Sequence, residues 1–173
     1  MLLLRRGEVP ASATLTAGGT AFIVSGELLR LWAVHHIGAI SRTRSDRLGP
    51  LIASGPFAWC RNPLYVGNVA LWVGFALLSR LVWLAPIAAA LLGAEYRAIV
   101  RWEEHLLECR FGESYRAYAA EVPRWLPRFV RGHRRKAGAP VVAVSWKETF
   151  FSERGTLIAI AAGYFLLWLK LKT

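Results

Sequence analysis

Cysteine and acidic residues are both scarce in this sequence. The chain has two cysteines among 173 residues, Cys60 and Cys109, with no C-x-x-C spacing and no neighbouring His–Cys cluster. The sequence therefore indicates neither a disulfide framework nor a metal site. Acidic residues number 11 against 22 lysines and arginines, so the formal net charge is +11. A charge of this sign and size suits anionic lipid headgroups or nucleic acid.

The chain also has few charged residues for its length. They make up 19% of the sequence, whereas 55% of the residues are hydrophobic and the mean hydropathy is +0.35. Soluble domains contain roughly 45–50% apolar residues, so the composition argues against an ordinary soluble enzyme. Nucleic-acid-binding proteins carry their positive charge on a polar framework, which is lacking here. We therefore expect membrane lipids, and no nucleic acid, as partners.

Long apolar runs predict an all-α, polytopic integral membrane protein. Residues 11–37 form the first expected helix, in which Glu27 and Arg30 lie on one face and can form an ion pair facing other helices. Residues 65–79 and 81–100 predict a tight central helical hairpin, because neither run leaves room for a long connecting loop.

The C-terminal region, residues 128–173, is expected to hold a basic segment and a last membrane helix. Residues 141–154 are short and amphipathic, and residues 155–169 are apolar. The second stretch predicts a short last span, with a helix lying on the membrane or packing against a partner as the alternative.

Charge asymmetry predicts the orientation of the protein. A hairpin returns the chain to its starting side, so residues 41–64 and 101–154 share one face, and both are basic. By the positive-inside rule this face is cytoplasmic. We expect a cofactor-binding lobe there, built from residues 41–64 and 97–128.

The ends of the hairpin carry the residues whose side chains are best suited to binding or catalysis. Arg61, Asn62 and Tyr65 precede or begin its first arm, and Glu103 and Glu104 follow its second arm. Because the hairpin returns, these side chains would face one another across one cleft at the membrane surface. A fixed cation, an amide and two carboxylates suit a zwitterionic cofactor.

These stretches contain a set of motifs in a recognisable order. The set resembles the integral-membrane methyltransferases that include isoprenylcysteine carboxyl methyltransferase and, more distantly, the phospholipid N-methyltransferases. The resemblance covers about residues 28–127 of a chain expected to form a single domain over residues 1–173. The matching motifs are Gly55-Pro56-Phe57, Arg61-Asn62-Pro63-Leu64-Tyr65-Val66-Gly67, Glu103-Glu104-His105-Leu106-Leu107, Phe111-Gly112, Tyr115, Tyr118, Val122-Pro123 and Pro127.

The resemblance implies S-adenosylmethionine as methyl donor on the cytoplasmic side and a lipophilic or prenylated acceptor entering from the bilayer. By motif position it assigns catalysis to Arg61 and Glu103. The cofactor-binding residues that it implies are Gly55, Asn62, Pro63, Tyr65, Glu104 and Tyr115.

The roles of the charged residues stay open at this level. Arg61 can orient the carboxylate of the acceptor or that of the donor through a bidentate contact. Glu103 or Glu104 can bind the ammonium or ribose hydroxyls of the donor, or take a proton from an amine acceptor. Asn62 stands where the family usually has histidine, and an amide can hydrogen-bond there but does not titrate near neutral pH.

Three functions follow from these residues. The first is carboxyl O-methylation of a lipophilic acceptor, and the second is phospholipid N-methylation. The third belongs to another class and is a non-catalytic membrane module that binds anionic lipid or a protein partner, which the asparagine at position 62 keeps open.

Overall fold

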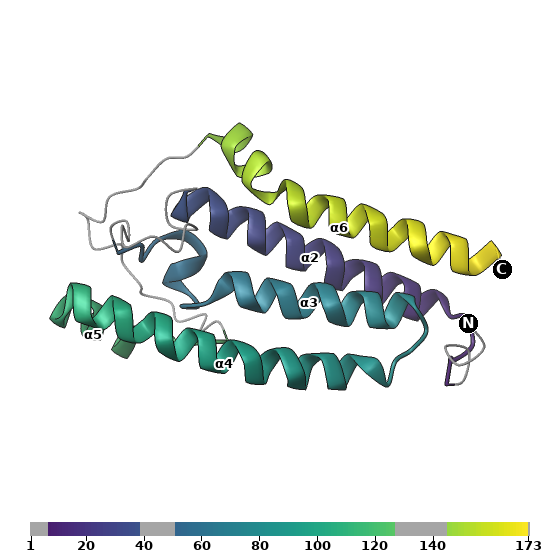
Figure 1. The fold of residues 1–173 in the computed structure, drawn as a ribbon, viewed down its shortest axis with the longest axis horizontal. Helices are drawn as coiled ribbons and strands as arrows, with labels where there is room; N and C mark the ends of the chain where they lie inside the picture. The colour runs from purple at the N-terminus through teal and green to yellow at the C-terminus, as the bar shows by residue number, and fades with distance from the viewer. Residues whose placement is uncertain (1–6, 39–50, 127–144, 173) are drawn as a thin grey trace.

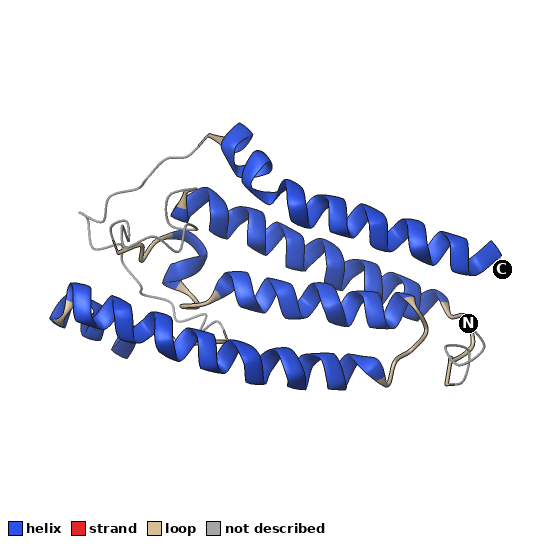
Figure 2. Cartoon of the chain, in the orientation of Figure 1, coloured by secondary structure: helices blue, strands red, loops and turns tan. Residues whose placement is uncertain are grey.

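The fold is a row of long helices. The computed structural model describes residues 7–38, 51–126 and 145–172, and within these ranges all regular structure is helical (Figures 1 and 2). This confirms the all-helical prediction for the described chain. Residues 41–50 of the expected loop at 41–64 lie outside the described residues, as do residues 127–136 of the basic run expected over 124–136. The elements are α2 (Ala13–Ile37), the short 3-10 helix η2 (Gly55–Ala58), α3 (Pro63–Leu78), α4 (Leu84–Phe111), α5 (Glu113–Glu121) and α6 (Trp146–Lys172).

Helices α2 and α3 approach each other closely through glycines. A Cβ atom added to Gly26 would lie 2.8 Å from the carbonyl oxygen of Gly67, and one added to Gly74 would lie 2.7 Å from that of Gly19. Gly19 and Gly26 are seven residues apart in α2, and Gly67 and Gly74 are seven residues apart in α3. The two glycines of each helix therefore lie on one face. Small residues at such positions let helix backbones touch, as in membrane helix pairs.

The predicted central hairpin is confirmed. Helix α3 ends at Leu78 and α4 begins at Leu84, with Arg80 in the intervening turn at a φ of 64°. Proline occupies the start of each arm, where a missing backbone N–H removes no intrahelical hydrogen bond: Pro63 begins α3, and Pro86 lies in the first turn of α4.

The C-terminal region differs from the sequence prediction. The last helix is longer than the short span expected over 155–169, because residues 146–172 form one continuous helix, α6. Gly155, at the expected junction, costs a helix only about 1 kcal/mol. Helix α6 lies beside α2 (Figure 1), and near its end Lys170 Nζ lies 2.7 Å from Glu8 Oε1 and donates to the Ser79 carbonyl oxygen.

One helix of the described chain, over Trp146–Lys170, is long and apolar enough to cross a membrane. The helix over Pro63–Leu78 is apolar but shorter.

The predicted ion pair in α2 is confirmed, since Arg30 Nε lies 3.6 Å from Glu27 Oε2 and both residues are buried.

Helix α4 continues well past the apolar run that begins it. It ends at Phe111, and Gly112, with a φ of 52°, lets the chain turn into α5. The Phe111-Gly112 motif thus marks the boundary between α4 and α5. Helix α5 lies at the end of the molecule opposite both termini (Figure 1).

Candidate functional site

The segment that precedes α3 is fastened to the segment that follows α5. The backbone N–H of Arg61 donates to the Pro123 carbonyl oxygen at 2.9 Å. The Cys60 thiol donates to the Trp125 carbonyl oxygen at 3.0 Å. These contacts fix where the Arg61 side chain begins and bring the residues after α5 to the start of the hairpin.

A single carboxylate then holds two arginines. Arg61 Nη1 lies 3.2 Å from Glu104 Oε1. Arg124 donates from Nε to the same oxygen at 3.1 Å and from Nη2 to Glu104 Oε2 at 2.5 Å. The Arg124 contact is bidentate, which fixes the plane of the guanidinium as well as its position. As predicted, the two ends of the hairpin meet through Arg61 and Glu104.

These side chains border a polar cavity of about 300 Å³ between α4, α5 and the start of the hairpin. Its lining contains Arg61, Glu104 and Tyr115 from the sequence prediction. Four arginines against two glutamates make the lining positive. The complete lining is Arg61, Arg101, Glu104, His105, Glu108, Tyr115, Arg116, Ala119 and Arg124.

Glu103 points in a different direction from Glu104. It is not among the residues lining the polar cavity; its Oε1 accepts a hydrogen bond from the Tyr65 hydroxyl of α3 at 2.9 Å. The Tyr65 ring in turn lies 4.6 Å from the Tyr96 ring, between centroids. The structure thus brings together two of the predicted residues, Tyr65 and Glu103, at the α3–α4 contact.

Gly55 and Pro63 also lie away from the polar cavity. Gly55 has a φ of 57°, and a Cβ atom there would lie 2.4 Å from His36 Nε2, so glycine is needed for this close approach. Pro63 lines a second cavity, of about 210 Å³, whose lining surface is apolar. The lining residues of this apolar cavity are Leu29, Trp32, Pro56, Trp59, Cys60, Pro63, Val66 and Trp125.

Asn62 makes a defined contact in place of the family's usual histidine. Its Nδ2 donates to the Arg124 carbonyl oxygen at 3.1 Å. Asn62 therefore supports the backbone of Arg124, the residue that makes the bidentate contact with Glu104.

Burial raises the pKa values of two tyrosines and a cysteine near the site. It raises the pKa of Tyr115, and the negative charge of Glu104 raises it further. Burial likewise raises the pKa of Tyr118, whose hydroxyl donates to the Phe57 carbonyl oxygen at 2.8 Å. The pKa of the Cys60 thiol is raised for the same reason. At neutral pH these groups are hydrogen-bond donors and not nucleophiles.

The most important residue that the sequence analysis missed is Arg124. The basic run in which it stands obscured it, although it directly follows the Val122-Pro123 motif. Arg101 and Glu108 carried another signal, because they lie three residues before and four residues after Glu104 and therefore share its helix face. Within the described residues, no three His, Cys, Asp or Glu side chains are grouped so as to hold a metal ion.

Comparison with known proteins identifies the family. The model of the phospholipid methyltransferase family matches residues 14–114. The chain therefore belongs to this family. The resemblance seen in the motifs is confirmed.

Curated relatives carry two kinds of name. The nickel-cobalt-cadmium resistance protein NccN of Alcaligenes xylosoxydans xylosoxydans is 33% identical over 117 residues, which are 68% of this chain and 52% of that protein. The protein-S-isoprenylcysteine O-methyltransferases of Homo sapiens and Rattus norvegicus are 32% and 30% identical over 134 and 133 residues. Each match covers 72% of this chain and 45% of the relative. The chain thus spans about half the length of these relatives.

Proposed function

We propose that this protein is a membrane-embedded, S-adenosylmethionine-dependent methyltransferase that acts on a lipophilic acceptor. Carboxyl O-methylation of a prenylated cysteine is the favoured reaction. The family match and the names of the human and rat relatives support methyl transfer. The observation that carries the proposal is the polar cavity in which Glu104 holds Arg61 and Arg124.

The cavity fits the chemistry of the proposed methyl donor. S-adenosylmethionine carries a carboxylate and an ammonium group, and it supplies a methyl group activated by a sulfonium. The guanidinium groups of Arg61, Arg101 and Arg124 suit the carboxylate, since arginine pairs with carboxylates in a bidentate manner. Glu108 suits the ammonium or the ribose hydroxyls.

Arg61 also lies at the boundary between the two cavities. It lines the polar one, whereas its neighbour Cys60 and nearby Pro63 line the apolar one. An acceptor with its apolar tail among these residues would present its polar head toward the Arg61 guanidinium. Such placement aligns the acceptor and removes water from it, which is most of what a displacement at an activated methyl group requires of a protein.

The charges of the site favour a carboxylate acceptor over an amine. A carboxylate is already ionised at neutral pH and needs a cation to orient it, whereas an amine needs a proton acceptor. Both oxygens of Glu104 are already engaged by guanidinium groups, so this carboxylate is not placed to contact an amine. Phospholipid N-methylation, which the name of the family supports, is the second candidate and would use Glu103 as the base.

The exposed surface supports embedding in a membrane. Phe151, Ile158, Phe165 and Leu166 of α6 are each more than half exposed, and burying them in lipid would remove a large apolar area from water. We place α2, the α3–α4 hairpin and α6 in the bilayer, with the polar cavity on the cytoplasmic face. Labelling Cys109, which is exposed near the cavity, in sealed and opened vesicles tests this orientation.

Calorimetry on the detergent-purified protein tests donor binding. We expect micromolar affinity for S-adenosylhomocysteine in the wild type and at least about a tenfold loss in Arg61→Ala, as for a charged hydrogen bond. Arg97→Ala is the matched control, because Arg97 is an exposed arginine of α4 outside both cavity linings. No binding at millimolar ligand contradicts the enzyme and favours the non-catalytic module.

Methyl transfer to two acceptors then separates the reactions. A farnesylated cysteine derivative and phosphatidylethanolamine are each incubated with labelled donor and purified protein. Label on the cysteine derivative alone supports O-methylation. Label on phosphatidylethanolamine alone overturns that choice in favour of N-methylation.

A further inference from the structure

A group of buried charges lies away from both cavities. Arg30 of α2 and Glu153 of α6 are 6% and 0% exposed. Arg30 Nη2 lies 2.6 Å from Glu153 Oε2 and donates to Thr156 Oγ1 at 2.9 Å. Neither charged residue is among the lining of the polar or the apolar cavity.

This ion pair is costly to build. Two charges removed from water lose their hydration, and the pair often stabilises a fold no better than well-packed apolar residues would. In a helix bundle surrounded by lipid, such residues are rare and are commonly functional. The contacts on the other side of Arg30 show what this pair is connected to.

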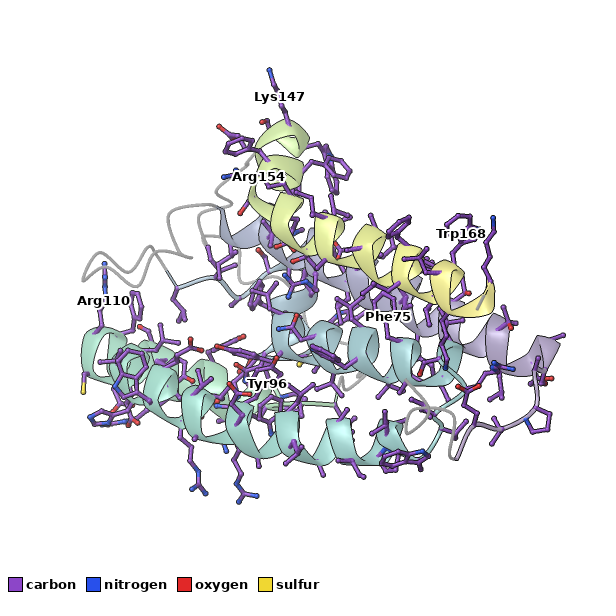
Figure 3. The ribbon with its side chains drawn as sticks, turned by 45° about the vertical axis from the view of Figure 1, so that its right-hand side comes forward. Phe75, Tyr96, Arg110, Lys147, Arg154 and Trp168 are labelled. Carbon is purple, nitrogen blue, oxygen red and sulfur yellow. The ribbon has the colours of Figure 1, made fainter. Side chains whose placement is uncertain are left out.

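Arg30 continues the polar contacts into α3 and α4. Its Nη1 donates to Asn68 Oδ1 on α3. This fixes the orientation of the amide, so Asn68 Nδ2 points at α4 and donates to the Tyr96 hydroxyl at 3.2 Å. Figure 3 shows Tyr96 between α4 and α3.

Tyr96 leads on to the candidate site. Its ring packs against the Tyr65 ring at 4.6 Å between centroids. The Tyr65 hydroxyl donates to Glu103 at 2.9 Å. An unbroken series of contacts thus runs from Glu153 in α6 to Glu103 in α4.

We propose that Glu153 and Arg30 are positioning residues for Glu103. They act through a relay of polar contacts and one ring contact, formed by Glu153, Arg30, Asn68, Tyr96, Tyr65 and Glu103. For its catalytic meaning the inference rests on the proposed function and on a role for Glu103 at the acceptor, which its motif position assigns to it. Glu153 lies beyond residue 114, where the family match ends, so α6 adds a support that the matched region does not contain. A carboxylate at a reaction centre needs its position held within about 0.5 Å by such supporting groups.

A double-mutant cycle on thermal unfolding tests the relay without any activity. The variants are Glu153→Gln, Glu103→Gln and the double variant, all as the full chain in detergent. Because the two residues are far apart in the relay, independent sites would give additive shifts of the unfolding midpoint. We expect the shifts to be non-additive. Additive shifts overturn the relay.

The matched control cycle combines Glu103→Gln with Lys170→Gln. Lys170 also fastens α6 to the rest of the molecule, but at the opposite end and outside the relay. We expect additive shifts in this cycle. Non-additivity of equal size would mean that general loosening of α6 explains the effect, and it would also overturn the relay.

The kinetics of Tyr96→Phe test whether the relay positions Glu103 for catalysis. This variant keeps the ring against Tyr65 and removes only the hydroxyl that Asn68 contacts. We expect kcat to fall roughly tenfold, as for a displaced catalytic group, with KM for the acceptor and affinity for S-adenosylhomocysteine changed less than about twofold. Tyr164→Phe, an exposed tyrosine of α6, is the control and keeps its kcat.

The two experiments separate the two proposals. Non-additive unfolding in a protein that neither binds the donor nor transfers methyl leaves the relay standing and overturns the proposed function. An unchanged kcat for Tyr96→Phe in an active wild-type enzyme overturns the positioning role.

Discussion

The Arg61 guanidinium lies 3.2 Å from the Glu104 carboxylate, across the junction between the start of the hairpin and the far half of α4. Arg124 holds the other side of the same carboxylate. The geometry of the polar cavity therefore depends on one acidic side chain that orients two basic ones.

Replacing Glu104 is expected to release both arginines. We expect Glu104→Gln to lower the affinity for S-adenosylhomocysteine by about tenfold, since charged hydrogen bonds are worth about 1.5–3 kcal/mol. The double variant Glu104→Gln, Arg124→Ala should bind no more than about threefold more weakly than Glu104→Gln, because the two residues act as one unit. Calorimetry measures the wild type, the single variants Glu104→Gln and Arg124→Ala, and the double variant. Glu95→Gln, an exposed glutamate of α4, is the control, and full additivity would contradict the shared role of Glu104.

The contact between Arg61 and Glu104 was predictable because it follows from local patterns. Two apolar runs separated only by a short turn at Ser79 and Arg80 form a hairpin, which brings its two ends to the same side. The end of α4 at the Phe111-Gly112 motif is also a local feature, since glycine tolerates the positive φ found there. Such features depend on a few neighbouring residues.

The contacts of Arg124 and Glu153 were not predictable in this way. Arg124 reaches Glu104 only because α5 reverses the chain, and a basic run gives no sign of which arginine will meet a carboxylate. Glu153 finds Arg30 across 123 residues, and nothing in the local pattern of α6 names its partner. The two adjacent glutamates could not be told apart from the sequence, because they belong to one motif. In the structure Glu103 faces α3, whereas Glu104 faces the polar cavity.

Gly26 is expected to tolerate no side chain. An added Cβ atom would lie 2.8 Å from the Gly67 carbonyl oxygen, which is backbone and cannot move aside easily. We expect Gly26→Ala to cost about 1–3 kcal/mol of stability, as for other overpacked sites. Gly18→Ala is the control, because Gly18 lies in the same helix with nothing within 4 Å of its added Cβ. Thermal unfolding in detergent compares the two, and equal midpoints would contradict the close packing of α2 on α3.

The two cysteines are expected to differ in reactivity. Cys60 is buried and its pKa is raised by that burial, so little thiolate forms at pH 8. Cys109 is exposed, with its Sγ 3.6 Å from His105 Nε2. We expect iodoacetamide to label Cys109 at least about tenfold faster than Cys60. Intact-mass measurement on Cys109→Ser and Cys60→Ser isolates each thiol, and comparable rates in the folded protein would contradict the burial of Cys60.

Stability at alkaline pH is expected to depend on Tyr118. Burial raises its pKa above the value of about 10 that an unfolded tyrosine has. The unfolded chain therefore loses this proton first as the pH rises, so the stability contributed by Tyr118 is complete below pH 10 and declines above it.

Removing the Tyr118 hydroxyl should change the slope of this decline. Tyr118→Phe loses the hydrogen bond to the Phe57 carbonyl oxygen, which costs about 1 kcal/mol at pH 8. Between pH 9 and pH 11 we expect its unfolding midpoint to fall less steeply than that of the wild type, because one titrating group has been removed. Tyr164→Phe serves as the control for removing a tyrosine hydroxyl elsewhere, because Tyr164 lies on α6 with its ring against Phe75, away from Tyr118. Parallel curves for Tyr118→Phe and the wild type would show that burial of this hydroxyl does not govern the alkaline transition.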